Sequence, residues 1–249
     1  QVRRSPGIDE GENLAKVGGV AASTSQPASA AARLAELDLP GNVHLGRTVL
    51  EPVRRLPSDV AAIDALLAGG WPRGRVSEIV GRRSCGKTAL LLASLAAATG
   101  RGEVVACVDV ADALHPESLR GAGVDLARLL WVRPPAGAAA LRCAEIVLQA
   151  GGFGVVVVDF GDTLPPRPRG YGWPRIARAT ERSQAACVVV APRSLAGSCS
   201  ALALALAPRR VRWQPGGWSL LDGLDARVQV VRNKLGAPGG TAALCVGVR

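Results

Sequence analysis

The sequence Gly81-Arg82-Arg83-Ser84-Cys85-Gly86-Lys87-Thr88 fits the phosphate-loop pattern G-x-x-x-x-G-K-[ST]. It lies between an apolar segment, residues 76–80, and an Ala- and Leu-rich segment, residues 86–99. These segments predict a strand followed by a helix. Glycines let the main chain wrap an anion closely, and the amides at a helix N-terminus point at phosphate groups. The motif therefore predicts a site for a nucleoside triphosphate.

Two side chains of this motif have predicted roles of their own. Lys87 is expected to contact the β- and γ-phosphates, and the Thr88 hydroxyl is expected to help hold Mg²⁺. The alternative is a glycine-rich turn that fits the pattern by chance. The chain has three lysines against twenty-seven arginines, and one of the three stands where the pattern requires lysine. This favours nucleotide binding.

Length and cysteine usage bound the class of protein. The 249 residues suffice for one large α/β domain with a small appendage. The six cysteines include no C-x-x-C pair, and most lie in apolar surroundings, so we expect reduced core thiols in a cytoplasmic protein without a metal site built from cysteine and histidine. We find no signal peptide and no segment that spans a membrane. The chain begins at Gln1 and contains no methionine, so we expect further sequence before it.

The chain is predicted to consist of an arm, residues 1–42, and a nucleotide-binding core, residues 43–249. The arm is rich in Ala, Ser and Gly and is expected to be largely disordered, with a short helix at residues 30–39. In the core, apolar runs predict strands that alternate with helices. The expected strands are 76–80, 104–109, 129–132, 155–159 and 187–190, and the expected helices are 86–99, 116–122, 138–150 and 173–184.

The fold class follows from this alternation. The run Val155-Val156-Val157-Val158 is apolar on both faces, as a buried parallel strand requires. After residue 200, Gly and Pro turns separate short strands expected at 209–214, 218–221, 226–232 and 242–248. We therefore predict an α/β fold with a mostly parallel twisted sheet, flanking helices and an antiparallel C-terminal edge.

Two aspartates close strands that follow the phosphate loop. Ligands of open α/β sheets bind at the carboxyl ends of strands, where Asp109 and Asp159 are expected to lie. Asp159 follows four valines and is predicted to hold Mg²⁺ directly or through water; its alternative role is to cap the next turn. Asp109 is predicted to orient water or to contact Thr88, and its alternative is a solvated loop position.

Positive charge is concentrated near the C-terminus. After residue 160 the chain has thirteen basic and four acidic residues, which predicts a basic face for single-stranded DNA. The proline-rich segment 161–172 carries Arg167, Arg169 and Tyr171, and Arg175 follows it. Arginine pairs with phosphates, and Tyr171 or Trp173 is expected to offer a stacking face for bases. The alternative is a solvated surface loop.

Further segments make the chain similar to the RecA recombinase superfamily, with a RecA-like P-loop NTPase core over about residues 56–249. They occur in the RecA order: 63–66, 69–75, 78–81, 113–116, 123–126 and 227–238. The resemblance implies ATP with Mg²⁺ as cofactors and single-stranded DNA as a partner. It also implies that Arg232 and Lys234 reach the nucleotide of an adjacent subunit, so a homo-oligomer is expected.

Departures from RecA are equally informative. RecA has a catalytic glutamate where this chain has Ala111, two residues after Asp109. The aromatic residue that stacks on adenine is replaced by Ser118, and the glutamine that senses the γ-phosphate is replaced near Ala191-Pro192. A general base typically contributes about 10² to 10⁴ in rate, so we expect ATP binding with weak hydrolysis. Asp112 and Glu117 are the alternative catalytic carboxylates.

Segments 69–74 and 123–134 are most similar to ImuA, a RecA-related accessory protein encoded with an error-prone polymerase. This resemblance implies a role in DNA repair during the SOS response, in damage-induced translesion synthesis and mutagenesis. The implied partners are a translesion polymerase, RecA and sliding-clamp-associated proteins. Alternative functions are an active DNA-dependent recombinase or a non-catalytic interaction module.

Overall fold

The structure is a computed structural model that describes residues 53–135, 137–162, 172–214, 220–236 and 239–247. The predicted arm, residues 1–42, lies outside the described residues. Ten strands are found in the described part, with the following bounds: β1 (Arg55–Leu56), β2 (Trp71–Pro72), β3 (Val76–Val80), β4 (Val104–Asp109), β5 (Leu129–Val132), β6 (Phe153–Asp159), β7 (Ala186–Ala191), β8 (Leu202–Trp213), β9 (Leu221–Asn233) and β10 (Thr241–Gly247).

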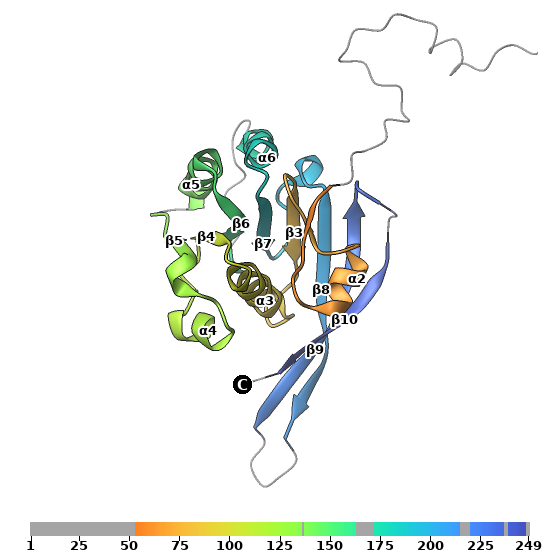
Figure 1. Cartoon of the computed structure of the whole chain (residues 1–249). Helices are drawn as coiled ribbons and strands as arrows, with labels where there is room; N and C mark the ends of the chain where they lie inside the picture. Colours follow the sequence, from red (N-terminus) through yellow and green to blue (C-terminus); the bar gives the residue numbers. More distant parts are fainter. Residues whose placement is uncertain (1–52, 136, 163–171, 215–219, 237–238, 248–249) are drawn as a thin grey trace, which may run out of the picture. The chain divides into compact units, whose positions relative to one another are not determined.

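Eight of these strands form one sheet in the order β10-β9-β8-β3-β7-β6-β4-β5 (Figure 1). The pairs from β8 through β3 to β5 are parallel, whereas β8 with β9 and β9 with β10 are antiparallel. The predicted fold class is therefore confirmed. Strand β3, which leads into the phosphate loop, lies between β7 and β8 in the interior of the sheet.

Helices cover both faces of the sheet (Figure 1). One hydrophobic cluster joins the strands to α2, α3 and α4, and a second joins them to α5 and α6. The helices have these bounds: α2 (Ala61–Leu66), α3 (Lys87–Gly100), α4 (Pro116–Gly121), α5 (Gly137–Ala150) and α6 (Gly172–Ser183).

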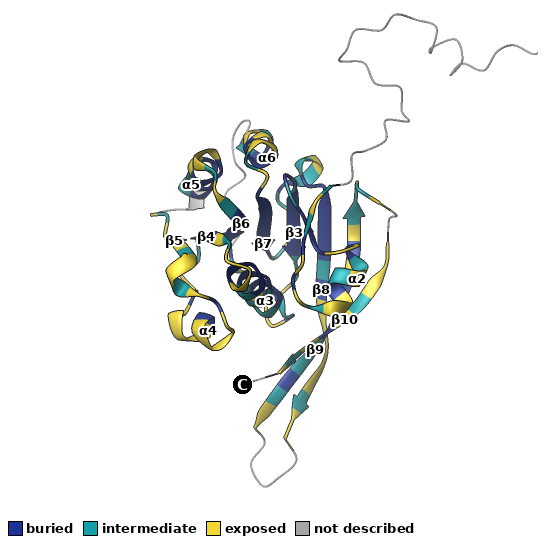
Figure 2. Ribbon diagram, viewed as in Figure 1, coloured by how far each residue is buried: buried dark blue, intermediate teal, exposed yellow. Residues whose placement is uncertain are grey.

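Strand β6 shows why its sequence is apolar without alternation. Val155 and Val157 pack in the cluster with α3, while Val156 and Val158 pack in the cluster with α5 and α6. Successive side chains of a strand point to opposite faces, so a strand covered on both faces needs apolar residues throughout. Figure 2 shows these central strands as the most buried part of the molecule.

Strands β8 and β9 are longer than predicted, whereas β10 has the predicted length. Strand β8 begins at Leu202 rather than at residue 209, and β9 runs unbroken from Leu221. Residues 202–206 alternate Leu and Ala, which are good helix formers, but pairing with β3 and β9 holds them extended. The β8–β9 hairpin projects beyond the sheet (Figure 1), and its outer part exposes Val211, Trp213 and Leu221.

Candidate nucleotide-binding site

The phosphate-loop motif forms a tight turn between β3 and α3. Ser84 and Gly86 both have positive φ, +56° and +91°, and α3 begins at Lys87. Left-handed residues in such a turn direct successive main-chain amides into one concavity that suits an anion. A Cβ on Gly81 would lie 2.5 Å from the Leu206 carbonyl oxygen and 2.6 Å from Cys85 Sγ, so this position needs glycine.

The antiparallel strands support this loop from the other side. A Cβ on Gly86 would lie 3.2 Å from Leu244 in β10 and 3.6 Å from Ala226 in β9. The C-terminal edge of the sheet thus packs against the phosphate loop, and it fixes where the loop amides point.

Lys87 lies in the centre of the site. Its side chain is 7% exposed, and its ammonium donates hydrogen bonds to the carbonyl oxygens of Gly81 and, at 3.4 Å, Arg82. Nζ also lies 3.1 Å from Oδ1 of Asp162, whose Oδ2 accepts a bond of 2.9 Å from Nε of Arg83. Asp162 was not predicted from the sequence. The signal that could have found it is a second acid three residues after Asp159.

Asp159 and Asp109 end neighbouring strands and are paired in the register of β4 with β6. Both are buried. Asp109 accepts bonds from the amides of Ala113 and Leu114, so the alternative of a solvated loop position is wrong. Asp159 accepts a bond of 2.7 Å from the Gly161 amide. Burial raises the pKa of Asp159, and the charge of Asp109 adds to this rise.

Replacing Asp159 with asparagine is expected to stabilise the metal-free protein by about 1 kcal/mol at neutral pH. The amide keeps an acceptor for the Gly161 N–H and removes a buried charge. Because the pKa of Asp159 is raised in the folded state, its charge costs stability above that pKa. The cost vanishes below the unfolded value, so the advantage of Asp159→Asn should shrink as the pH falls through the raised pKa toward about pH 4, near the ordinary pKa of an aspartate. Thermal unfolding in a chelator measures this, and a less stable variant at neutral pH would contradict it.

These residues fit ATP and Mg²⁺. The loop turn with its left-handed residues and the Gly81 cradle suit a phosphate chain, and Lys87 supplies a cation within it. Thr88 is exposed in the first turn of α3, so its hydroxyl can take part in Mg²⁺ coordination together with Asp159. Of the remaining motif residues, Arg82, Arg83 and Ser84 are exposed and Cys85 is buried.

The cysteines have no sign of chemical function. All six are free, and Cys85, Cys107 and Cys187 are buried. Burial raises the pKa of Cys85, raises that of Cys107 well above its ordinary value, and raises that of Cys187 to about 12. These thiols therefore stay protonated and unreactive.

The structure does not bring Arg232 and Lys234 to the phosphate loop of the same chain. Asn233 pairs with Leu202, which pairs with Ser77 at the amino end of β3, whereas the loop follows its carboxyl end. Arg232 donates to the Gly197 carbonyl oxygen and, at 3.0 Å, to Ser200, and Lys234 donates to the Ser198 carbonyl oxygen. Their predicted contact with a neighbouring subunit's nucleotide remains a prediction.

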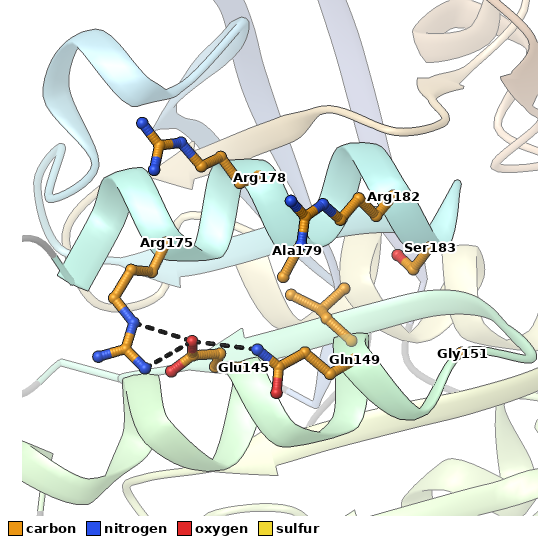
Figure 3. Close-up of a pocket in the computed structure, with 9 residues that line it drawn as sticks. Glu145, Gln149, Gly151, Arg175, Arg178, Ala179, Arg182 and Ser183 are labelled. Carbon is orange, nitrogen blue, oxygen red and sulfur yellow. Dashed lines mark hydrogen bonds and ion pairs between the residues drawn. The ribbon is translucent and has the colours of Figure 1, made fainter.

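The predicted DNA-binding residues divide into two sets. Arg167, Arg169 and Tyr171 lie outside the described residues. Arg175 lies on α6, beside a groove of about 550 Å³ between α5 and α6, and its guanidinium pairs with Glu145 at 2.8 Å (Figure 3). The prediction that Trp173 offers a stacking face is wrong, because this side chain is 8% exposed and packs in the core beneath α6.

Several exposed arginines form no ion pair among the described residues, and some of them lie on α6 and on the β8–β9 hairpin. Arg178 and Arg182 are exposed on α6, and Arg209, Arg210 and Arg227 are exposed on the β8–β9 hairpin. Figure 1 shows α6 and the outer part of the hairpin at opposite ends of the view. The exposed arginines of α6 and those of the hairpin therefore belong to separate parts of the surface.

The alternative catalytic carboxylates are both exposed. Asp112 forms an exposed ion pair with Arg133 at 3.6 Å, and Glu117 is exposed in the first turn of α4. Ser118 also belongs to this turn, where its amide donates to Nδ1 of His115. Ala111 lies beside Gly161: a Cβ built on Gly161 would approach the Ala111 Cβ to 2.9 Å.

Comparison with known proteins places this loop and its sheet in a family. The profile of the RecA N-terminal domain matches residues 40–205, from the segment before β1 to β8. The chain belongs to the RecA N-terminal domain family. The match includes the phosphate loop and both strand-ending aspartates.

Curated relatives and a solved structure agree with this membership. Protein RecA of Mycobacterium marinum is 40% identical over 126 residues, 50% of this chain and 36% of that protein. Protein RecA of Clavibacter michiganensis subsp. michiganensis is 37% identical over 153 residues, 59% of this chain and 42% of that protein. The chain thus spans well under half the length of these RecA relatives. The RadB recombinase structure shares the fold, with a TM-score of 0.58 and 20% identity over 76% of this chain and 94% of that one.

In the part of the chain that the structure describes, no helix combines the length and apolar character needed to cross a bilayer.

Proposed function

We propose that this protein is an ATP-binding accessory factor of DNA repair that supports damage-induced translesion synthesis in the manner of ImuA, with weak or absent ATP hydrolysis. One observation carries the proposal: a complete phosphate loop around the buried Lys87, combined with alanine at position 111. ATP binding requires the phosphate loop with its lysine, and fast ATP hydrolysis would require an acid in place of Ala111.

The binding half of the proposal is supported by the geometry of the loop. Main-chain amides, a buried lysine and the strand-ending Asp159 together match the needs of a Mg²⁺-bound triphosphate. Membership of the RecA family supports the same ligand, since ATP with Mg²⁺ is the cofactor that the family uses. The protein's side chains would grip the phosphates and orient the metal, which supplies charge neutralisation when it is bound.

The part of the proposal that concerns weak ATP hydrolysis is supported by the chemistry of the residues near Lys87. Asp162 is the carboxylate in contact with Lys87, but hydrogen bonds from Arg83 and Lys87 hold its pKa below the usual value. A base with a lowered pKa accepts a proton poorly at neutral pH. Ala111 has no group that could orient water.

The proposed partners are single-stranded DNA, a translesion polymerase, RecA itself and sliding-clamp-associated proteins. The exposed arginines on α6 and on the β8–β9 hairpin support an acidic partner such as DNA. Arg232 and Lys234 support a homo-oligomer, in which they would approach the nucleotide of the next subunit.

We expect ATP turnover by the purified protein to lie about 10² to 10⁴ below that of a RecA recombinase, because the general base is missing. The measurement is phosphate release with and without single-stranded DNA, next to calorimetry of ATP binding. ATP binding without appreciable turnover supports the proposal. Brisk DNA-stimulated hydrolysis would instead favour an active recombinase, with another carboxylate in the catalytic role.

A further inference from the structure

Asp162 forms ion pairs with two cations of the phosphate loop at once. Its Oδ1 lies 3.1 Å from Nζ of Lys87, and its Oδ2 lies 2.9 Å from Nε of Arg83. It links the segment after β6 to the phosphate loop through two ion pairs. The Asp162 side chain is 35% exposed, so solvent reaches it, while Lys87 is buried.

The ammonium of Lys87 has three donors, and the structure accounts for all of them. Two go to the carbonyl oxygens of Gly81 and Arg82, and the third goes to Asp162. A phosphate oxygen and a carboxylate oxygen accept the same kind of charge-assisted hydrogen bond. A phosphate oxygen that binds Lys87 must therefore displace one of these acceptors, and Asp162 is the acceptor whose negative charge a phosphate would repel.

We propose that Asp162 is an internal competitor for phosphate. In the nucleotide-free protein its carboxylate neutralises Lys87 and Arg83. It thereby sets which anions bind to the phosphate loop and how tightly they bind. This inference rests on the proposed function, because it assumes that the loop binds a nucleotide. It adds a residue that regulates the affinity of the site, and it assigns the Lys87–Asp162 ion pair to the nucleotide-free state.

The close approach of residue 111 to the turn at Gly161 explains how the Asp162 side chain comes to lie beside Lys87. Gly161 has a φ of +57°, and a Cβ on it would approach the Ala111 Cβ to 2.9 Å. The turn that leads to Asp162 thus passes directly against Ala111. A glutamate at position 111 would add four more heavy atoms and a like charge beside this turn. The small side chain at position 111 therefore leaves room for the turn that places the acid at position 162 beside Lys87.

The chemistry of Asp162 fits a counter-ion better than a catalyst. Hydrogen bonds from Arg83 and Lys87 lower the pKa of Asp162, so it stays charged at neutral pH. A charged carboxylate pairs well with cations, whereas a general base works best when its pKa lies near the working pH.

The test is calorimetry of Mg²⁺-ATP and Mg²⁺-ADP with the full chain carrying Asp162→Asn or Asp162→Ala. Both variants should bind ATP about 5- to 20-fold more tightly than the unmodified protein, because no carboxylate has to be displaced. The matched control is Asp59→Asn, which removes an exposed ion pair with Arg101 and should leave the affinity unchanged. Asparagine tolerates the positive φ of position 59.

Thermal unfolding gives a second readout that does not depend on turnover. Without nucleotide, Asp162→Asn should unfold at a lower temperature than the unmodified protein, and the shift on adding saturating ATP should be larger. Equal or weaker ATP binding by both variants would overturn the inference while leaving the proposed function intact. If neither the unmodified protein nor the variants bind ATP, the proposed function fails and this inference fails with it.

Discussion

Lys87→Ala is expected to weaken ATP binding by about 100-fold. A charge-assisted hydrogen bond contributes about 1.5–3 kcal/mol, and the lysine at this position would bond the phosphates without competition from water. The side chain is 7% exposed and already directed at the loop carbonyls, so little conformational freedom is lost when a phosphate binds. Calorimetry with Mg²⁺-ATP measures the effect directly.

Two further variants make the result specific. Arg120→Ala removes one positive charge from the exposed face of α4, away from the loop, and should leave ATP affinity unchanged. Lys87→Gln keeps a donor for the loop carbonyls but lacks the charge, so it separates folding of the loop from phosphate binding. ATP affinity that survives in both Lys87 variants would show that the nucleotide does not bind at this loop.

The second large effect is expected at Glu78, in the middle of β3. Its carboxylate is 0% exposed and accepts hydrogen bonds from Ser194 Oγ at 2.8 Å and from the amides of Leu195 and Ala196 at 2.7 and 2.9 Å. Arg232 lies 3.6 Å away as its counter-ion. Glu78 thus ties the segment after β7 to the strand that carries the phosphate loop.

Glu78→Ala is expected to lower the free energy of unfolding by about 3 kcal/mol, because it leaves buried amides without an acceptor and removes the counter-ion of Arg232. For a domain of this size the loss corresponds to a fall of about 6–12 °C in Tm. Glu181→Ala is the matched control, since its exposed ion pair with Arg75 should contribute less than about 1 kcal/mol. Denaturant titrations compare the two, and a loss of less than about 1 kcal/mol for Glu78→Ala would contradict the structural role.

The sequence predicted the parallel half of the sheet well because its signals are local. Uninterrupted apolar runs such as 155–158 have few alternatives to a buried strand, and the phosphate-loop pattern fixes the turn between β3 and α3. Asp109 and Asp159 were located for the same reason, since each is the last residue of its strand. Strand ends and motifs can be read without knowing what packs against them.

The remaining features depend on contacts that are distant in sequence. Residues 202–206 have the composition of a helix, and only pairing with β3 and β9 makes them a strand. Trp173 was assigned to a binding surface because it borders an arginine-rich segment, but the amphipathic pattern of α6 turns it into the core. Asp162 is 75 residues from Lys87, so their contact depends on how β6 and β3 are placed in the sheet.

The arrangement of the cysteines makes the protein convenient for spectroscopy without mutation. Cys245 is the exposed one of the six, and its neighbours Leu244 and Val246 in β10 lie 3.2 and 3.8 Å from where a Cβ on Gly86 of the phosphate loop would stand. A thiol-reactive dye should therefore label this strand first, while the buried thiols are shielded. Such a label would sit on the structural support of the loop and report its rearrangement in a stopped-flow fluorimeter.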